Sequence, residues 1–138
     1  MKQSVEVFVD TSGFKALVDE KDEFHYRAVE KWDNFARKGV SLVTSNYILD
    51  ESYTLIRVKC GLKVVKNFRI LLAEGLKDIK VSRITLDDEL LAWDWFGKDW
   101  SGLSFTDCVS FAVMKRLGIK QVFGFDNHFK RAGFEVVN

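Results

Sequence analysis

Short apolar segments alternate with longer amphipathic segments along nearly the whole chain, and this alternation restricts the possible folds more than any other feature. Apolar runs typical of strands occupy residues 5–9, 40–43, 80–84, 121–125 and 135–137. Helical patterns fill most of the intervals and end near residues 20, 38, 60, 76, 96 and 117. Strands that alternate with helices predict an α/β fold with a mainly parallel sheet. We therefore expect an α/β/α sandwich around a central sheet of four or five strands.

Small hydroxyl residues mark several of the expected helix starts, because serine and threonine favour the N-cap position. Ser12 is predicted to cap the first helix, from residue 13 to 20. Thr44 or Ser45 is predicted to cap the third helix. Ser104 or Thr106 is predicted to cap the last long helix, and one further helical turn is expected after residue 126. The chain has no proline, so glycines mark the helix ends.

Length and composition indicate an ordinary globular domain. The 138 residues suit one domain, so we expect residues 1–138 to form a single unit. A hydrophobic share of 47% and an aromatic share of 14% exclude a disordered chain. No apolar run approaches the roughly 18 residues of a membrane helix, and the N-terminus lacks the features of a signal peptide. Two cysteines are too few for a disulfide framework or a zinc site, so we expect a cytoplasmic protein without membrane contact.

Four acidic residues are expected to meet at one edge of the sheet. Asp10 directly follows the first predicted strand, and Asp126 directly follows the fourth. Glu51 and Asp107 lie near the starts of helices that begin at the same edge, where the carboxyl ends of parallel strands meet. Like charges this close repel one another, and a divalent cation that prefers oxygen ligands removes that cost. The pattern therefore predicts a Mg²⁺ or Mn²⁺ site held by these four carboxylates.

Polar residues beside these acids are candidates for orienting the carboxylates or holding metal-bound water. They are Thr11, Ser12, Thr44, Ser45, Thr106 and Asn127. Simpler explanations stay open for the acids themselves. Asp10 alone suits a helix cap, and Asp107 suits a negative charge at a helix start. Only one of Asp50 and Glu51 can face the sheet, and helical spacing to Leu55 favours Glu51.

Four segments together resemble the PIN-domain family, and within it the VapC-type toxins of toxin–antitoxin pairs. They are VFVDTS at residues 7–12, TSNYILDE at 44–51, LSFTDCVSFA at 103–112 and VFGFDNHF at 122–129. Each segment alone is short, but all four in this order are fairly specific and span essentially the whole chain. The acidic positions of the family map onto Asp10, Glu51, Asp107 and Asp126, and its hydroxyl after the first acid maps onto Thr11.

The resemblance implies a PIN-like fold and a metal-dependent endoribonuclease that hydrolyses single-stranded RNA, plausible as the toxin of a toxin–antitoxin pair. It also implies a homodimer and inhibition by a small antitoxin protein. Such hydrolysis needs no histidine, because a bound metal polarises the phosphate and activates water. The chain departs from the family at Gly124, where threonine commonly stands two residues before the last acid. The missing hydroxyl bears on the metal geometry and on whether the chain is active.

Basic residues are candidates for binding the RNA backbone. The chain outside the four acids is basic, since 21 lysines and arginines stand against 20 acids in total. The group predicted to bind RNA contains Arg57, Lys59, Lys63, Lys66 and Arg69. Two further groups, Lys115 with Arg116 and Lys120, and Lys130 with Arg131, are expected to be solvated faces. Phosphate contacts of this kind would make RNA binding sensitive to salt and tolerant of sequence.

Aromatic and histidine residues near the last motifs allow two interpretations each. The aromatic stretch contains Trp93, Trp95, Phe96, Trp100 and Phe105 and is expected to be mainly core or dimer surface. Stacking on an unpaired base is the alternative. His128 is expected to be a surface residue, and contact with a phosphate is the alternative.

Two other functions stay open from the sequence. One is a phosphatase in which Asp10 acts as the nucleophile, although such enzymes usually carry a second acid where Ser12 stands. The other is a catalytically inactive PIN-like module that binds RNA through a vestigial acidic pocket. A trapped phospho-aspartate would favour the first, and RNA left uncut at all Mg²⁺ and Mn²⁺ concentrations would favour the second.

Overall fold

The computed structural model describes residues 5–75 and 78–138. Within them, the strands are β1 (Glu6–Val9), β2 (Ser41–Ser45), β3 (Lys80–Ser82), β4 (Gln121–Phe123) and β5 (Glu135–Val137). These strands form one sheet in the order β3-β2-β1-β4-β5, and every neighbouring pair is parallel. The predicted α/β fold with a parallel sheet is therefore confirmed.

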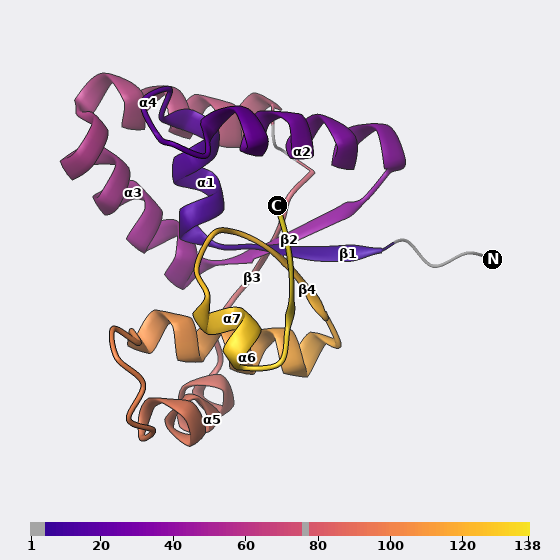
Figure 1. The fold of residues 1–138 in the computed structure, drawn as a ribbon, viewed down its shortest axis with the longest axis vertical. Helices are drawn as coiled ribbons and strands as arrows, with labels where there is room; N and C mark the ends of the chain where they lie inside the picture. Colours follow the sequence, from indigo (N-terminus) through magenta and orange to yellow (C-terminus); the bar gives the residue numbers. More distant parts are fainter. Residues whose placement is uncertain (1–4, 76–77) are drawn as a thin grey trace.

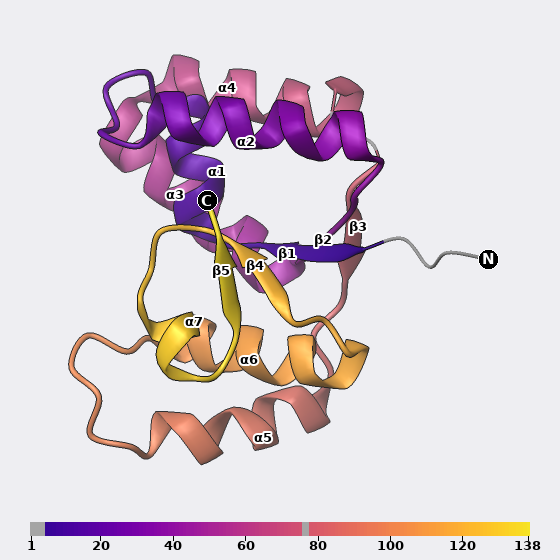
Figure 2. The same cartoon turned by 45° about the vertical axis from the view of Figure 1, so that its right-hand side comes forward.

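Helices cover both faces of this sheet. They are α1 (Thr11–Val18), α2 (His25–Lys38), α3 (Asn46–Cys60), α4 (Leu62–Ile70), α5 (Leu86–Phe96), α6 (Phe105–Leu117) and α7 (His128–Arg131). Helices α1 to α4 lie on one side of the sheet and α5 to α7 on the other, as both Figure 1 and Figure 2 show. The layers are those of the predicted α/β/α sandwich. Among the described residues, no helix combines the length and the apolar character needed to cross a membrane.

The fourth strand is shorter than its apolar pattern predicts. It ends at Phe123 rather than at residue 125, and the N–H of Phe125 donates to the hydroxyl of Ser12 at 2.9 Å instead of to a neighbouring strand. Asp126 is therefore separated from β4 by a short bend. The prediction that Asp126 directly follows the strand is wrong, because a side chain from α1 ends the strand early.

One other predicted boundary also differs from the structure. The third strand ends at Ser82 rather than at residue 84, because the N–H of Ile84 donates to Oδ1 of Asn46 at 2.8 Å. The fourth helix ends as an α-helix at Ile70 and continues as a π-helical turn, Leu71–Gly75. Its predicted end at residue 76 lies outside the described residues, so of these two elements the structure shows only the third strand to be shorter than predicted.

The strand order reverses direction at the carboxyl edge of the sheet. From β1 the chain moves outward to β2 and β3, and then returns to the other side of β1 to form β4 and β5. The direction of connection therefore reverses between β1 and β4, where Val9 lies beside Phe123. In open parallel sheets, ligands bind outside the carboxyl ends of the strands at such a reversal. The residues that follow Val9 and Phe123 are the natural place for a functional site.

Helix α6 is buried over most of its length, from Asp107 to Met114. At its end, Arg116 pairs with both carboxylate oxygens of Asp88 on α5 at 2.9 Å. Asp88 is 2% exposed and shares a capping box with Thr85 at the start of α5. Arg116 is exposed, as predicted, but its guanidinium also neutralises a buried carboxylate.

The aromatic stretch belongs mainly to the core, as predicted. The residues that pack against the core are Trp95, Phe96, Trp100 and Phe105. Trp93 contacts the rings of Phe96 and Phe105 but remains 58% exposed. Arg131, predicted to be solvated, places its guanidinium 4.5 Å from the centre of the Trp100 ring.

Replacing Gly13 by alanine is expected to destabilise the protein by about 1–3 kcal/mol, the usual cost of overpacking. A Cβ atom at Gly13 would lie 2.7 Å from the carbonyl oxygen of Phe123 and 2.7 Å from its ring, so α1 would have to move away from β4. Urea unfolding of the two proteins measures the difference. Gly97→Ala is the control, since its added Cβ would lie 3.2 Å from the nearest atom outside its chain neighbours. Equal midpoints for Gly13→Ala and wild type would contradict this packing.

Candidate active site

Asp10 lies at the reversal between β1 and β4, and its N–H donates to the carbonyl oxygen of Phe123 at 3.0 Å. Its Oδ2 accepts the Ser12 hydroxyl at 2.8 Å and the Ser12 N–H at 3.4 Å. Asp10 therefore caps α1, and the prediction that Ser12 caps a helix starting at residue 13 is wrong. The second oxygen, Oδ1, is buried without a hydrogen-bond partner among the described residues. The cap uses one oxygen and leaves the other for a further ligand.

Asp107 lies in the first turn of α6, where it forms a capping box with Ser104. The Asp107 N–H donates to Oγ of Ser104 at 3.0 Å, and the Ser104 N–H donates to Oδ2 of Asp107 at 3.3 Å. Ser104, rather than Thr106, is thus the cap. The reciprocal bonds hold the Asp107 carboxylate, which is 6% exposed, at a defined position on the helix.

Glu51 and Asp126 complete the acidic group. Glu51 is half-buried on α3, whereas its neighbour Asp50 is exposed, as the spacing along the helix predicted. Asp126 is half-buried, and its Oδ1 accepts the N–H of His128 at 2.9 Å. That bond forms the tight turn that leads into α7.

The charges of Glu51, Asp107 and Asp126 act on Asp10, and those of Glu51 and Asp126 act on Asp107. Burial is the main cause that raises the pKa of Asp10 from 3.8 to about 7, followed by the charge of Asp107, and the charges of Asp126 and Glu51 add to it. Burial likewise raises the pKa of Asp107 from 3.8 to about 6, with the charges of Asp126 and Glu51 contributing. The hydrogen bond from Ser12 opposes the shift at Asp10. Such mutual repulsion requires carboxylates that share one small region.

The hydroxyl groups of Thr44 and Ser45, at the end of β2, form hydrogen bonds with backbone atoms rather than with carboxylates. Thr44 is buried, and its hydroxyl donates to the carbonyl oxygen of Val9 at 2.9 Å, which fixes the end of β1. Ser45 caps α3 by accepting the N–H of Ile48 at 3.1 Å, which decides between the two predicted caps. Neither hydroxyl is engaged with an acidic side chain.

Thr11, Thr106 and Asn127, the other residues predicted to assist the acids, differ in burial and in hydrogen bonding. Thr11 is buried next to Asp10, and its hydroxyl has no partner among the described residues. At Thr106, the hydrogen bond involves the backbone carbonyl, which accepts the hydroxyl of Ser110 at 2.8 Å. Asn127 is exposed, and its side chain does not cap α7. Of the three, Thr11 has a buried hydroxyl available for another group.

The hydroxyl missing at Gly124 is supplied by Ser12. A Cβ atom at Gly124 would lie 2.9 Å from Oγ of Ser12 and 3.1 Å from Cβ of Asp10, both closer than normal packing. The Ser12 hydroxyl, which donates to Asp10, therefore occupies the space that a side chain at position 124 would need. The departure from the family pattern leaves Asp10 with a hydroxyl partner.

His128 lies at the carboxylates, so the prediction of an ordinary surface histidine is wrong. Its Nδ1 lies 3.0 Å from Oδ1 of Asp126 and 3.4 Å from Oδ2 of Asp107. Its Nε2 lies 2.9 Å from the carbonyl oxygen of Ser101. Burial acts to lower the pKa of His128, but the Ser101 carbonyl and the two carboxylates outweigh it and raise this pKa. The available signal was the position of His128 two residues after Asp126, within the same turn.

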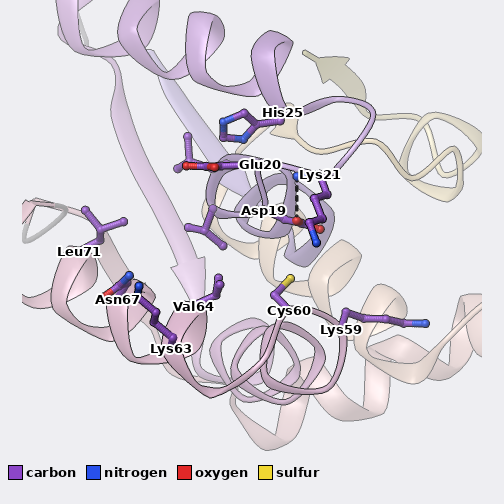
Figure 3. Close-up of a pocket in the computed structure, with 12 residues that line it drawn as sticks. Asp19, Glu20, Lys21, His25, Lys59, Cys60, Lys63, Val64, Asn67 and Leu71 are labelled. Atoms are coloured by element: carbon purple, nitrogen blue, oxygen red, sulfur yellow. Dashed lines mark hydrogen bonds between the residues drawn. The ribbon is translucent and has the colours of Figure 1, made fainter.

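The residues predicted to bind RNA are exposed and extend from the end of α3 onto α4. Arg57 and Lys59 lie in the last turn of α3, and Lys63 and Arg69 lie on α4. Lys59 and Lys63 line a cleft of about 700 Å³ between these helices and the end of α1 (Figure 3). The cleft is separate from the carboxylates, since none of the four acids lines it.

The donor set suits a hard divalent cation. Four carboxylates supply oxygen ligands, which magnesium and manganese prefer. Among the described residues Oδ1 of Asp10 has no hydrogen-bond partner, and burial and neighbouring charges raise the pKa values of Asp10 and Asp107, so a cation would be favoured here. An acidic cluster of this kind is typical of metal-dependent nucleases.

Comparison with known proteins agrees with this fold. A model of the PIN domain matches residues 7–135, and the chain belongs to the PIN-domain family. Among curated proteins, it is 36% identical over 129 residues to the 23S rRNA-specific endonuclease VapC20 of Mycobacterium tuberculosis, found in two strains. The match covers 93% of this chain and 95% of that protein. The predicted class, a VapC-type endonuclease that hydrolyses phosphodiester bonds, is thereby confirmed.

Solved structures support the same conclusion. The crystal structure of M. tuberculosis VapC20, described as a sarcin–ricin loop cleaving toxin, matches with a TM-score of 0.81 and 35% identity, covering 93% of this chain and 95% of that one. FitAcB from Neisseria gonorrhoeae matches with a TM-score of 0.65 and 15% identity, covering 96% of each chain. PAE2754 from Pyrobaculum aerophilum matches with a TM-score of 0.62 and 21% identity, covering 96% of this chain and 90% of that one. The last two matches show a shared fold.

Proposed function

We propose that this VapC-type endonuclease uses Mg²⁺ or Mn²⁺ to hydrolyse single-stranded or loop RNA, with ribosomal RNA as the first substrate to test. The observation that supports the proposal is that the charges of Glu51, Asp107 and Asp126 act on Asp10, the buried acid that follows β1 at the reversal between β1 and β4. The similarity to VapC20 over most of both chains supports ribosomal RNA. One PIN-like domain spanning residues 1–138 would carry the whole activity.

The four carboxylates differ in exposure and in the hydrogen bonds that hold them, so we assign them different roles. Asp10 caps α1 and Asp107 forms the capping box of α6 with Ser104, so both carboxylates are held in place and would fix the position of the metal. Glu51 and Asp126 are more exposed and would orient water and substrate at the open side. The bound metal would polarise the phosphate and lower the pKa of water. The Ser12 hydroxyl holds Oδ2 of Asp10, which keeps Oδ1 directed to its ligand.

A single-turnover assay tests this function. Excess enzyme is mixed with an end-labelled RNA hairpin and with 23S rRNA, in EDTA and across Mg²⁺ and Mn²⁺ concentrations. We expect cleavage that needs the metal, without a covalent enzyme species. A phospho-enzyme that forms at Asp10 would instead indicate a phosphatase. RNA that stays intact at every metal concentration would indicate a catalytically inactive module.

We also propose that RNA reaches the carboxylates along the basic residues of α3 and α4. Lys59→Gln together with Lys63→Gln is expected to weaken RNA binding, because each lysine neutralises one phosphate. Each phosphate contact on a single strand contributes roughly 0.7 to the slope of log affinity against log salt, so the loss of two contacts should make the slope shallower by about 1.4. Binding is measured in EDTA to prevent cleavage. Lys115→Gln with Lys120→Gln, two exposed lysines elsewhere, is the control; an equal loss in both pairs would argue against a defined path.

The predicted homodimer has a suitable surface on α5. Leu86, Leu90 and Trp93 follow one another at helical spacing and are 70%, 62% and 58% exposed, and such apolar stripes are typical of interaction surfaces. We expect Leu90→Glu to convert a dimer into a monomer in light scattering. Tyr26→Glu, on α2, should leave the mass unchanged. A dimeric Leu90→Glu variant would place the interface elsewhere. Inhibition by a small antitoxin protein also stays a prediction. The first check is whether a short open reading frame lies next to the gene for this protein.

A further inference from the structure

The tautomer of His128 follows from its two contacts. Its Nε2 lies 2.9 Å from the carbonyl oxygen of Ser101. A carbonyl oxygen can only accept, so Nε2 carries a hydrogen. In the neutral ring the lone pair therefore belongs to Nδ1. That atom faces Asp126 and Asp107 rather than solvent.

The position of Nδ1 resembles that of a ligand more than that of a hydrogen-bond donor. Nδ1 is buried and, within the described part of the chain, forms no hydrogen bond, although Oδ1 of Asp126 is only 3.0 Å away. Ligand atoms from Asp107, Asp126 and His128 all lie within 4.8 Å of one another. Ligands at right angles around an octahedral ion with bonds of about 2.1 Å are roughly 3.0 Å apart. The spacing of Nδ1 from the two carboxylates, 3.0 and 3.4 Å, therefore suits atoms that share one cation.

A second observation points to a ligand at the same place. Asp10 is 3% exposed, and its Oδ1 has no hydrogen-bond partner among the described residues. Asp107 is the charge that acts most strongly on Asp10, so this unpartnered oxygen belongs to the same group. An oxygen this buried is normally paired, and a cation would pair it.

We propose that Nδ1 of His128 is a direct ligand of the metal and makes the site select Mn²⁺ over Mg²⁺. The proposal rests on the metal-dependent function proposed above and adds a nitrogen donor to its four carboxylates. Imidazole is a good ligand for transition metals, whereas Mg²⁺ is bound mainly by oxygen. His128 therefore adds affinity for Mn²⁺ that Mg²⁺ does not share.

A protonated His128 makes the opposite prediction. A charged ring paired with Asp126 and Asp107 would compete with any cation for the same oxygens. Its removal would then leave the affinities for Mg²⁺ and Mn²⁺ unchanged or raise both. Because only the ligand role predicts a loss of Mn²⁺ affinity when His128 is replaced, metal binding distinguishes the two roles without any activity assay.

Calorimetric titration of the full chain with Mn²⁺ and with Mg²⁺ tests the proposal. His128→Gln is expected to lose at least about 10-fold in Mn²⁺ affinity, with Mg²⁺ affinity unchanged. His25→Gln is the matched control, because Nδ1 of His25 is bound to the carbonyl oxygen of Ala16 on the α1 side of the sheet. Pulsed electron paramagnetic resonance of the Mn²⁺-loaded wild type should show coupling to a directly bound ¹⁴N nucleus. This coupling should vanish in His128→Gln and persist in His25→Gln.

Wild-type protein that binds Mn²⁺ without nitrogen coupling would overturn the proposal, and this measurement does not depend on the folding of any variant. Unchanged or tighter Mn²⁺ binding by His128→Gln would overturn it as well. Failure of the proposed function has a different signature. In that case wild type would bind neither ion, or Asp107→Asn would bind both ions as tightly as wild type.

Discussion

Replacing Asp107 by asparagine is expected to abolish RNA cleavage while leaving the fold intact. Asparagine keeps the size of the side chain and an oxygen that can accept the N–H of Ser104, so the capping box of α6 survives. The lost charge removes one proposed metal ligand. Loss of a group that merely orients a ligand costs roughly 10–100-fold, so loss of the ligand itself should exceed that range. Single-turnover cleavage measures the rate, and circular dichroism checks the fold.

Asp88→Asn provides a matched control for this variant. Asp88 holds the equivalent position in the capping box of α5, but it pairs with Arg116 and stands outside the acidic group. Its replacement should lower the melting temperature, because the Arg116 charge loses its buried partner. The folded Asp88→Asn protein should still cleave RNA. Wild-type cleavage by Asp107→Asn would remove Asp107 from the proposed site.

Replacing Asp10 by asparagine is expected to raise the melting temperature in EDTA at neutral pH. The pKa of Asp10 in the folded protein is about 7, above its ordinary value of 3.8, chiefly because of burial and the charge of Asp107. The folded state therefore holds this proton more tightly than the unfolded state. The contribution of Asp10 to stability must therefore fall as the pH rises from about 4 to 7, and the full difference corresponds to about 4 kcal/mol. Asparagine removes this cost and can still cap α1 through its side-chain oxygen.

The same variant should respond weakly to metal. Ions that bind the folded state stabilise it by about 2.7 kcal/mol at 100 times the dissociation constant. Wild type should gain this stability with Mg²⁺ or Mn²⁺, whereas Asp10→Asn should gain much less, so the melting curves approach or cross. The measurement is the melting temperature of wild type and of Asp10→Asn at pH 4 and at pH 8, each with EDTA and with metal. If Asp10 only caps the helix, Asp10→Asn will melt at or below wild type in EDTA and respond to metal as wild type does.

The acidic group could be predicted only in part from the sequence. Asp10 follows a strand in the sequence, so its place at the sheet edge could be predicted from periodicity and from the direction of parallel strands. The choice between helix cap and metal ligand could not, since both use the same residue. Only the structure shows that the cap occupies Oδ2 and that Oδ1 is buried without a partner.

His128 and Ser12 illustrate the opposite case. The short spacing of His128 from Asp126 is visible in the sequence, but the carbonyl of Ser101 that orients its ring is 27 residues away in the chain. Ser12 is 112 positions before Gly124, yet its hydroxyl fills the space that a side chain at 124 would need. Neither relation leaves a periodic signal, because each depends on elements that meet only after folding.

The alternation of strands and helices, the parallel sheet and the position of Asp10 at its edge could be predicted from the sequence. These features depend on hydrophobic period and on capping chemistry, which act over a few neighbouring residues. The strand order, and with it the reversal between β1 and β4, became known only from the tertiary structure. The tertiary structure also decided where β4 ends, which ring faces the carboxylates and which arginine pairs with Asp88. Burial and Coulomb interactions act through space, so they are set by packing between segments that lie far apart along the chain.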